Sequence, residues 1–111
     1  MAMVAKSVNR FEIWLIDLNP TQGREINKTR PCVVISPDEM SALSTAIVAP
    51  MTTKGFEFPG RIACEFGNKK GLILLDQIRA VDKSRLIKKK GSIDKNTQIL
   101  LCSTLQEMFD Y

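Results

Sequence analysis

Short apolar stretches separated by turn residues run along most of the chain. Residues 11–18 (FEIWLIDL) and 31–36 (PCVVIS) are rich in β-branched and aromatic residues and end at turn-forming residues, which is typical of strands. Gly67 and Asn68 separate two further apolar stretches and predict a tight hairpin. The same pattern predicts strands at residues 44–51, 61–66, 71–76, 78–81 and 86–89.

A helical period is found in the last segment of the chain. Asp94 stands where a helix N-cap is expected, and the apolar residues after it recur on one face of a helix. These residues are Leu101, Cys102, Leu105, Met108 and Phe109. A short helical turn is also predicted at residues 36–43, with Ser36 as its cap and Pro37 in its first position. Several short strands followed by one helix indicate a mainly β fold, a small barrel or strongly bent sheet with a helix packed on it.

Two polar segments interrupt the strands and are expected to be loops. Residues 19–29 (NPTQGREINKT) carry Pro and Gly, and so do residues 52–60. Loops of about a dozen residues in a compact domain are usually functional or mobile. The first of these loops is therefore a candidate for contact with a ligand.

Length and composition are those of one globular domain covering residues 1–111, with 44% hydrophobic and 25% charged residues. No apolar run approaches the ~20 residues that cross a bilayer, and residues 1–10 lack the apolar stretch of a secretion signal. We therefore expect a cytoplasmic protein that does not enter a membrane. Three cysteines in apolar surroundings, Cys32, Cys64 and Cys102, predict buried thiols in a reducing compartment.

Charge and missing residue types narrow the possible chemistry. The net charge of +4 favours polyanions such as RNA without establishing them as partners. The chain has no histidine, so the usual proton shuttle near neutral pH is missing. Without histidine, paired cysteines or a tight carboxylate cluster, we expect neither a metal site nor another cofactor.

Five segments, taken in order and spacing, resemble the MazF/PemK toxins over about 80 residues. They are EIWLIDLNPTQGRE, TRPCVVIS, VAPMT, GLILLDQIRAVDKSRL and KKKG. The resemblance implies a small SH3-like β-barrel of the CcdB/PemK type that forms a homodimer. It further implies an endoribonuclease (mRNA interferase) that cleaves single-stranded RNA at selected sequences, inhibits translation and growth, and is neutralised by a MazE/PemI-like antitoxin.

Matching the motifs residue by residue gives a candidate catalytic set. Arg30 matches the family's catalytic arginine before proline, Thr52 the hydroxyl residue that closes Pro-x-Thr, and Glu25 the acidic residue of the first loop. Some relatives carry histidine and arginine at the positions of Arg24 and Leu74, so the acid and base roles proposed for those relatives do not carry over. Candidate RNA-binding residues are Arg24, Lys28, Thr53, Lys54, Phe56, Asp76, Gln77, Arg79 and Arg85.

Cleavage of RNA without metal uses the ribose 2′-hydroxyl as nucleophile and leaves a 2′,3′-cyclic phosphate and a 5′-hydroxyl. Arg30 suits the stabilisation of charge on the phosphate, because guanidinium offers a planar fork of donors and stays charged. Thr52 can donate to a phosphate oxygen, and Glu25 is the best candidate for the base. The structural alternatives are a surface salt bridge for Arg30 and a turn cap for Thr52. Asp76 is as suited to orienting Arg79 or the backbone as to chemistry.

Other features leave alternatives open. The basic residues Lys69, Lys70, Lys83, Arg85, Lys88, Lys89 and Lys90 form either a solvated face or a track for phosphates. Phe56 and Phe58 either stack on unpaired bases or fix their loop to the barrel. Trp14 is expected in the core or in a dimer interface.

Two other functions compete with the nuclease. A gyrase poison of the CcdB type has a related barrel, but its activity lies in a tryptophan-bearing C-terminal end that residues 107–111 (EMFDY) do not match. The third possibility is a non-catalytic interaction module on the same fold.

Overall fold

The computed structural model describes residues 7–20, 23 and 28–110. Within these ranges seven strands precede one α-helix, with three short 3₁₀ turns between them. The strands are β1 (Glu12–Asp17), β2 (Thr29–Val34), β3 (Thr45–Thr52), β4 (Arg61–Phe66), β5 (Lys69–Leu74), β6 (Arg79–Asp82) and β7 (Leu86–Ser92). The 3₁₀ turns are η1 (Asp38–Met40), η2 (Leu75–Gln77) and η3 (Lys83–Arg85), and the helix is α1 (Lys95–Met108).

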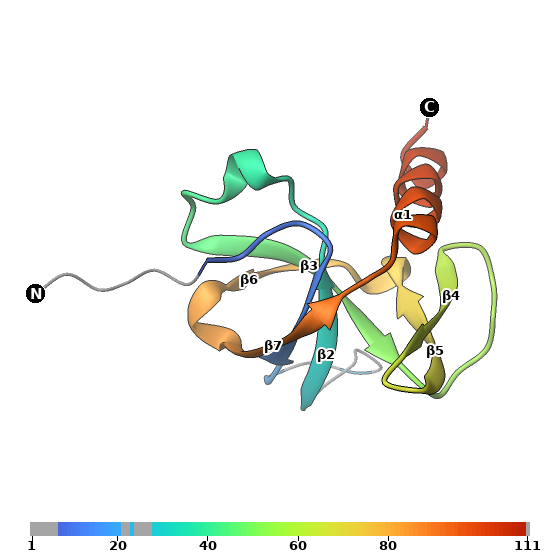
Figure 1. The fold of residues 1–111 in the computed structure, drawn as a ribbon, viewed down its shortest axis with the longest axis horizontal. Helices are drawn as coiled ribbons and strands as arrows, with labels where there is room; N and C mark the ends of the chain where they lie inside the picture. The colour runs from blue at the N-terminus through green and yellow to red at the C-terminus, as the bar shows by residue number, and fades with distance from the viewer. Residues whose placement is uncertain (1–6, 21–22, 24–27, 111) are drawn as a thin grey trace, which may run out of the picture.

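The strands form one curled antiparallel sheet in the order β4-β5-β3-β2-β1-β7, with β6 paired to β3 (Figure 1). The two end strands of this order, β4 and β7, lie close to each other. A Cβ built on Gly91 of β7 would be 3.5 Å from Cε1 of Phe66 in β4. Gly67 and Asn68 both have positive φ, as a two-residue hairpin between β4 and β5 requires. The sheet with its C-terminal helix confirms the predicted fold class.

The sheet buries apolar side chains on both faces. Trp14 and Ile16 of β1 belong to one buried cluster, with Val34 and Val48 from the neighbouring strands. Ile13, on the opposite face of β1, belongs to a second cluster, which also takes in residues of β5 and α1. Trp14 is therefore a core residue, one of the two places predicted for it.

The predicted helix is present, but its apolar face is only partly covered. Asp94 caps it as expected, since its Oδ1 accepts a 2.8 Å hydrogen bond from the backbone N–H of Thr97. Leu101 is fully buried, whereas Met108 is 38% and Phe109 70% exposed. The helix thus packs on the sheet as predicted through Leu101, while Met108 and Phe109 stay exposed because the end of α1 extends past the sheet (Figure 1).

Two smaller predictions are corrected. Ser36 does not cap η1, because its Oγ accepts a hydrogen bond from the N–H of Ile47 at 3.2 Å and so holds β3 instead. Of the three cysteines, Cys32 is buried as predicted, but Cys64 and Cys102 are only half-buried. Both lie near the edge of the second cluster, where strand and helix meet solvent.

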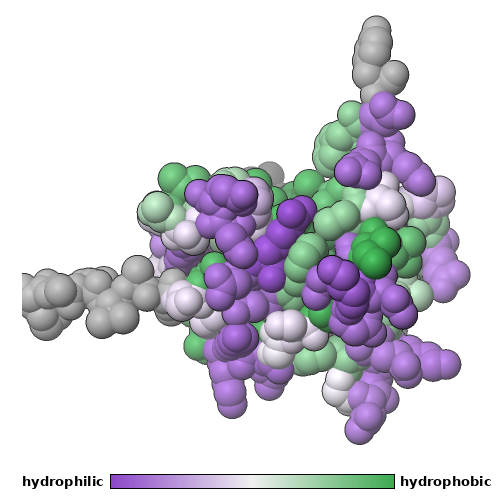
Figure 2. Space-filling view, turned by 45° about the horizontal axis from the view of Figure 1, so that its top comes forward, coloured by the Kyte–Doolittle hydropathy of each residue, from purple (hydrophilic) through white to green (hydrophobic). Residues whose placement is uncertain are grey.

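The surface of the described residues mixes apolar and polar side chains. On the face shown in Figure 2, hydrophobic areas are interrupted by hydrophilic side chains. Within the part of the chain that the structure describes, no helix is long and apolar enough to cross a membrane.

Glu12 is a buried carboxylate at the junction of β1 and β7. It is 5% exposed and accepts hydrogen bonds from the Asn9 N–H (2.9 Å) and the Trp14 indole N–H (3.0 Å), while Lys89 Nζ lies 2.8 Å from its Oε2. Burial raises the pKa of Glu12, but the hydrogen bonds from Lys89, Asn9 and Trp14 outweigh it, and the pKa lies below its ordinary value. The ionised form therefore stabilises the fold.

We expect Glu12→Ala to lower the free energy of unfolding by about 2 kcal/mol or more at pH 7, because buried donors lose their acceptor. Since the folded pKa of Glu12 is lowered, its contribution is present above its unfolded pKa and is lost as the pH falls through the folded value. The difference between wild type and variant should accordingly shrink in acid. Urea denaturation at pH 7 and in acid measures this difference in the free energy of unfolding. Equal stabilities of wild type and Glu12→Ala at pH 7 would contradict a stabilising role for the ionised carboxylate.

Candidate active site

Arg30 and Thr52 lie on neighbouring strands, at the ends that meet on one side of the molecule. The antiparallel pairing of β2 with β3 runs from Val34–Val48 to Cys32–Pro50, and Arg30 and Thr52 each lie two residues beyond its last pair. Residues directly opposite in a sheet point to the same face. β2 begins and β3 ends at the lower side of the molecule in Figure 1, so both residues stand where the sheet opens to its loops.

A cavity of about 200 Å³ collects these two side chains with residues of the β4–β5 hairpin. It is lined by Arg30, Pro31, Met51, Thr52, Thr53, Cys64, Phe66, Lys69 and Gly71. A second cation, Lys69, thus faces the same space as Arg30. The cavity joins an arginine, a lysine and hydroxyl groups, which is a set of donors suited to a phosphate.

Gly71 allows the hairpin to approach so closely. A Cβ at this position would lie 2.7 Å from the carbonyl oxygen of Thr52, a distance that real Cβ atoms essentially never show. Only glycine fits there without a backbone shift. The glycine of β5 therefore determines the width of the cavity beside Thr52.

The guanidinium of Arg30 is not neutralised by its described surroundings. Its Nε is buried without a hydrogen-bond partner among the described residues, and Arg30 takes part in neither of the ion pairs Arg61–Asp76 and Lys89–Glu12. The salt-bridge alternative for Arg30 finds no support among these residues. A buried, unpartnered donor in a cavity is a group that a ligand can satisfy.

Thr52 is a turn cap, as its structural alternative predicted. Its Oγ1 accepts a hydrogen bond from the backbone N–H of Lys54 at 3.1 Å. Because an accepting hydroxyl still has its own proton to donate, this bond leaves the O–H of Thr52 free to point to a ligand. The cap and the proposed donor role are compatible.

Cys32 and Cys64 do not supply a nucleophile. Burial raises the pKa of Cys32 to about 12, more than nearby Arg79 lowers it. Burial and the charge of Asp94 raise the pKa of Cys64. Both thiols stay protonated near neutral pH, and a protonated thiol is a poor nucleophile.

Several predicted residues fall outside or at the border of the described ranges. Glu25 and Arg24 lie outside them. Lys28 is at the border, and its N–H donates to Oδ1 of Asn19 at 3.0 Å while its carbonyl accepts from the N–H of Leu18 at 3.0 Å. These bonds close the base of the first loop next to β2.

Arg79 and Arg85, predicted as RNA-binding, hold the end of β1. Arg79 Nη1 donates to the carbonyl of Leu18 at 3.2 Å. Arg85 Nη1 donates to the carbonyl of Asp17 at 3.1 Å and also to that of Asn19. The orientation of Arg79 by Asp76, considered above, is wrong, since Arg79 binds backbone oxygen instead. Both arginines position the strand from which the first loop departs.

Asp76 pairs with Arg61, a residue that the sequence did not single out. The Arg61 Nε–Asp76 Oδ1 distance is 3.2 Å and the Nη2–Oδ2 distance 3.3 Å. Gln77 follows in η2, half-buried. Phe56 and Phe58 lie against the same guanidinium. Sequence reasoning missed three residues of this region or assigned them elsewhere: Arg61, Phe66 and Lys69. The pairing of β4 with β5 in a hairpin is the feature that could have revealed them.

The basic residues of the second half have different surroundings. Lys89 is paired with Glu12, and Lys69 lines the cavity. Lys88 and Lys90 are exposed on β7. Among the residues with described positions, no group of three or more histidine, cysteine or carboxylate side chains could hold a metal ion.

Comparison with known proteins identifies the family. A family model described as "PemK-like, MazF-like toxin of type II toxin-antitoxin system" matches residues 9–109. The chain belongs to this toxin family. Among relatives, the Endoribonuclease MazF of Staphylococcus epidermidis is 31% identical over 99 residues (83% of this chain, 82% of the relative). The Endoribonuclease MazF of Staphylococcus saprophyticus is 37% identical over 89 residues (74% of each chain).

Solved MazF structures have the same fold. Crystalline MazF from Deinococcus radiodurans superposes with a TM-score of 0.82 at 17% identity, covering 96% of this chain and 99% of that one. An endoribonuclease solved with its cognate antitoxin, from a mycobacterial species, gives a TM-score of 0.76 at 17% identity, covering 90% and 92%. The comparisons confirm the predicted MazF/PemK family and, through the named endoribonucleases, the RNA-cleaving toxin over the gyrase poison and the interaction module.

Proposed function

We propose that this MazF-like toxin cleaves single-stranded RNA, including mRNA, at selected sequences without a metal ion, and that Arg30 and Thr52 act on the scissile phosphate. The observation that carries the proposal is that the guanidinium of Arg30, whose Nε has no partner among the described residues, shares one cavity with Thr52, whose hydroxyl accepts a hydrogen bond and keeps its proton to donate. Hydrogen-bond donors that are already held toward the charge that develops in the transition state usually make the largest single contribution to the rate enhancement.

The reaction that these groups suit is an internal transesterification. The 2′-oxygen attacks phosphorus, the bond from phosphorus to the 5′-oxygen breaks, and the 2′-proton passes to a base while the 5′-oxygen gains a proton. Arg30 stabilises the added negative charge on phosphorus, and Thr52 donates to a non-bridging oxygen. Glu25 is proposed as the base, on its match to the family motif. The products are then a 2′,3′-cyclic phosphate and a 5′-hydroxyl.

Residues around the cavity suit contact with the flanking nucleotides. Thr53 lines it, Lys54 follows on the same loop, and Lys69 adds a second positive charge. We assign Lys54, Lys69 and, on the first loop, Arg24 and Lys28 to phosphate contacts, which position RNA without reading its bases. Arg79 and Arg85 contribute indirectly, by holding the start of the first loop.

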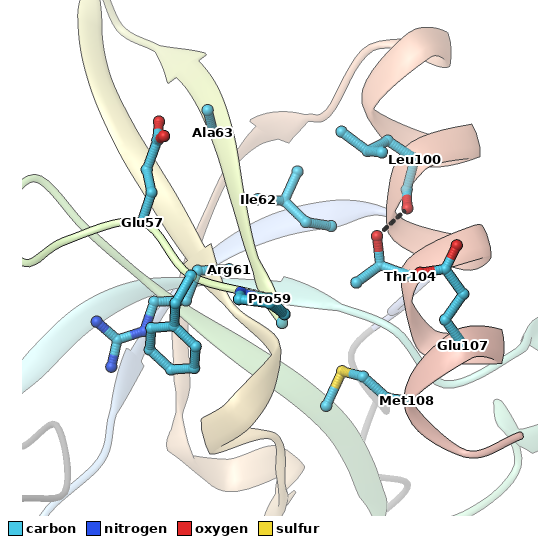
Figure 3. Close-up of a pocket in the computed structure, with 11 residues that line it drawn as sticks. Glu57, Pro59, Arg61, Ile62, Ala63, Leu100, Thr104, Glu107 and Met108 are labelled. Atoms are coloured by element: carbon cyan, nitrogen blue, oxygen red, sulfur yellow. Dashed lines mark hydrogen bonds between the residues drawn. The ribbon is translucent and has the colours of Figure 1, made fainter.

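A homodimer and a cognate antitoxin are proposed as partners in the cytosol. In support, a pocket of about 660 Å³ lies between α1 and the start of β4, with Leu100, Met108 and Ile62 among its lining residues (Figure 3). Ile99 and Phe109 of the helix segment are 58% and 70% exposed, a large apolar exposure for a monomer. Light scattering should give twice the mass of one chain, and a concentration-independent monomer would contradict the dimer.

Incubation of the purified chain with a long mixed-sequence RNA in excess EDTA tests the proposed function. We expect discrete cuts at a recurring short sequence, because the proposed transesterification uses no metal ion. A strict need for added divalent cation would overturn the mechanism. Gyrase-dependent DNA breaks, or no cleavage of any nucleic acid, would instead favour the gyrase poison or the interaction module.

A further inference from the structure

Arg61, the first residue of β4, is bound on three sides. Both carboxylate oxygens of Asp76 accept from its Nε and Nη2, at 3.2 and 3.3 Å, and the carbonyl of Phe56 accepts from its Nη1 at 3.3 Å. The Arg61 side chain is only 14% exposed. A planar guanidinium engaged in this way is held in one orientation. The fork therefore ties η2 to the aromatic loop, residues 53–60.

Two aromatic rings rest on this guanidinium. Its Cζ lies 4.3 Å from the ring centroid of Phe58 and 5.1 Å from that of Phe56, and the two centroids are 5.6 Å apart. Both contacts are within the range of cation–π attraction. Gly55 lets the loop backbone pass, since it has φ +111° and a Cβ there would lie 3.4 Å from Nη1 of Arg61. The loop is thus packed around one side chain.

The outer ring of this stack is open to solvent. Phe56 is 70% exposed, against 37% for Phe58. Phe58 has the shorter contact with the guanidinium, and a role in fixing the loop to the barrel accounts for its position. The same role does not account for Phe56, because most of its ring stays uncovered. An aromatic face that is held in place yet exposed is what proteins offer to an unpaired base.

The aromatic loop starts at the cavity. Phe56 follows Thr52 by four residues, so the two α-carbons are at most about 14 Å apart. The hydrogen bond from Lys54 N–H to Thr52 Oγ1 fixes the intervening turn. Arg61 and Phe58 also border the groove beside the helix, but in Figure 3 the side chain of Arg61 points away from Leu100 and Met108 of α1.

We propose that Arg61, fixed by Asp76, is a positioning residue that presents Phe56 as a stacking platform for a base next to the scissile phosphate. The inference rests on the proposed function, and it gives Asp76 a structural role. An aspartate with both oxygens engaged by one guanidinium holds that guanidinium instead of carrying a proton in the reaction.

The test uses an RNA oligonucleotide with the cut site and copies with one abasic ribose at each flanking position. With wild type, one abasic position should lower kcat/KM roughly ten-fold, mainly through KM, because a stacked base is lost. Phe56→Leu should lower kcat/KM for the intact RNA by a similar factor and no longer respond to that abasic position. Arg61→Lys and Asp76→Asn should act in the same direction, and Phe56→Tyr should retain the wild-type response.

A matched control and a second readout separate positioning from folding. Arg10 also lies over an aromatic ring, 5.0 Å from the centroid of Phe11, and contacts Cys102 of α1 instead of the aromatic loop. Arg10→Lys should leave the abasic response unchanged. Limited chymotrypsin digestion should cut after Phe56 faster in Arg61→Lys and Asp76→Asn than in wild type.

The outcomes separate this inference from the proposed function. Cleavage by wild type with no position sensitive to base loss, or with equal sensitivity in Phe56→Leu and Arg61→Lys, overturns the inference alone. The inference is also overturned if Arg61→Lys and Asp76→Asn leave the rate of chymotrypsin digestion of the aromatic loop unchanged. A wild-type chain that cleaves no RNA overturns the proposed function and this inference with it.

Discussion

A single 2′-deoxy substitution at the cut nucleotide will abolish cleavage of an otherwise unmodified RNA. The proposed nucleophile is the 2′-hydroxyl, which the substrate already holds beside its own phosphorus. The described residues offer no obvious activator of water, since the chain has no histidine and the thiols of Cys32 and Cys64 stay protonated. Removing one oxygen therefore removes the attacking group, and the loss should reach the detection limit of the assay.

Binding should survive this substitution. Arg30, Lys69 and the other cations contact phosphate in our proposal, and the deoxy strand retains every phosphate. Filter binding with intact and deoxy-substituted strands provides the control, with equal affinity expected within a few-fold. Cleavage of the deoxy strand at a comparable rate would show that water attacks, and would remove Glu25, Arg30 and Thr52 from the roles assigned to them.

Arg30→Ala is expected to lower kcat by on the order of 10²-fold or more while the protein stays folded. Removal of one preorganised group that stabilises transition-state charge has that magnitude. Folding should be spared, because the Nε of Arg30 makes no hydrogen bond that the fold would lose. Arg30→Lys retains the charge but not the fork, so it should recover only part of the rate.

Thr52→Ala should also lower kcat strongly, and Thr52→Ser is its matched control. Serine retains both the acceptor for the Lys54 N–H and the O–H donor, so Thr52→Ser should stay near the wild-type rate. Single-turnover cleavage and circular dichroism of each variant measure rate and fold. A folded Arg30→Ala or Thr52→Ala variant at the wild-type rate would take that residue out of the mechanism.

Much of the fold could be predicted because the deciding interactions are local. The β-branched and aromatic residues of segment 11–18, the Gly67-Asn68 turn and the Asp94 cap are all signals between neighbours in sequence. The exposure of Met108 and Phe109 could not be predicted in this way. A helical period shows which residues share a face, but the length of sheet beneath that face depends on the tertiary fold.

The site was only partly predictable for the same reason. Arg30 and Thr52 were identified through motifs of a resembling family, and the β2–β3 register explains why those motifs lie together. The pairing of Arg61 with Asp76 joins residues 15 positions apart, and their sequence spacing carries no trace of it. Likewise, nothing local indicates that Arg79 donates to the carbonyl of Leu18, 61 residues away.

The chemical ends of the cleavage products test the central claim most directly. Cleavage of a defined RNA by the purified chain in excess EDTA, followed by mass spectrometry of both fragments, identifies them. The account predicts a 2′,3′-cyclic phosphate on the upstream fragment and a 5′-hydroxyl on the downstream fragment, because the 2′-oxygen displaces the 5′-oxygen at phosphorus. A 5′-phosphate paired with an unmodified 3′-hydroxyl would contradict it, since those ends arise when water attacks.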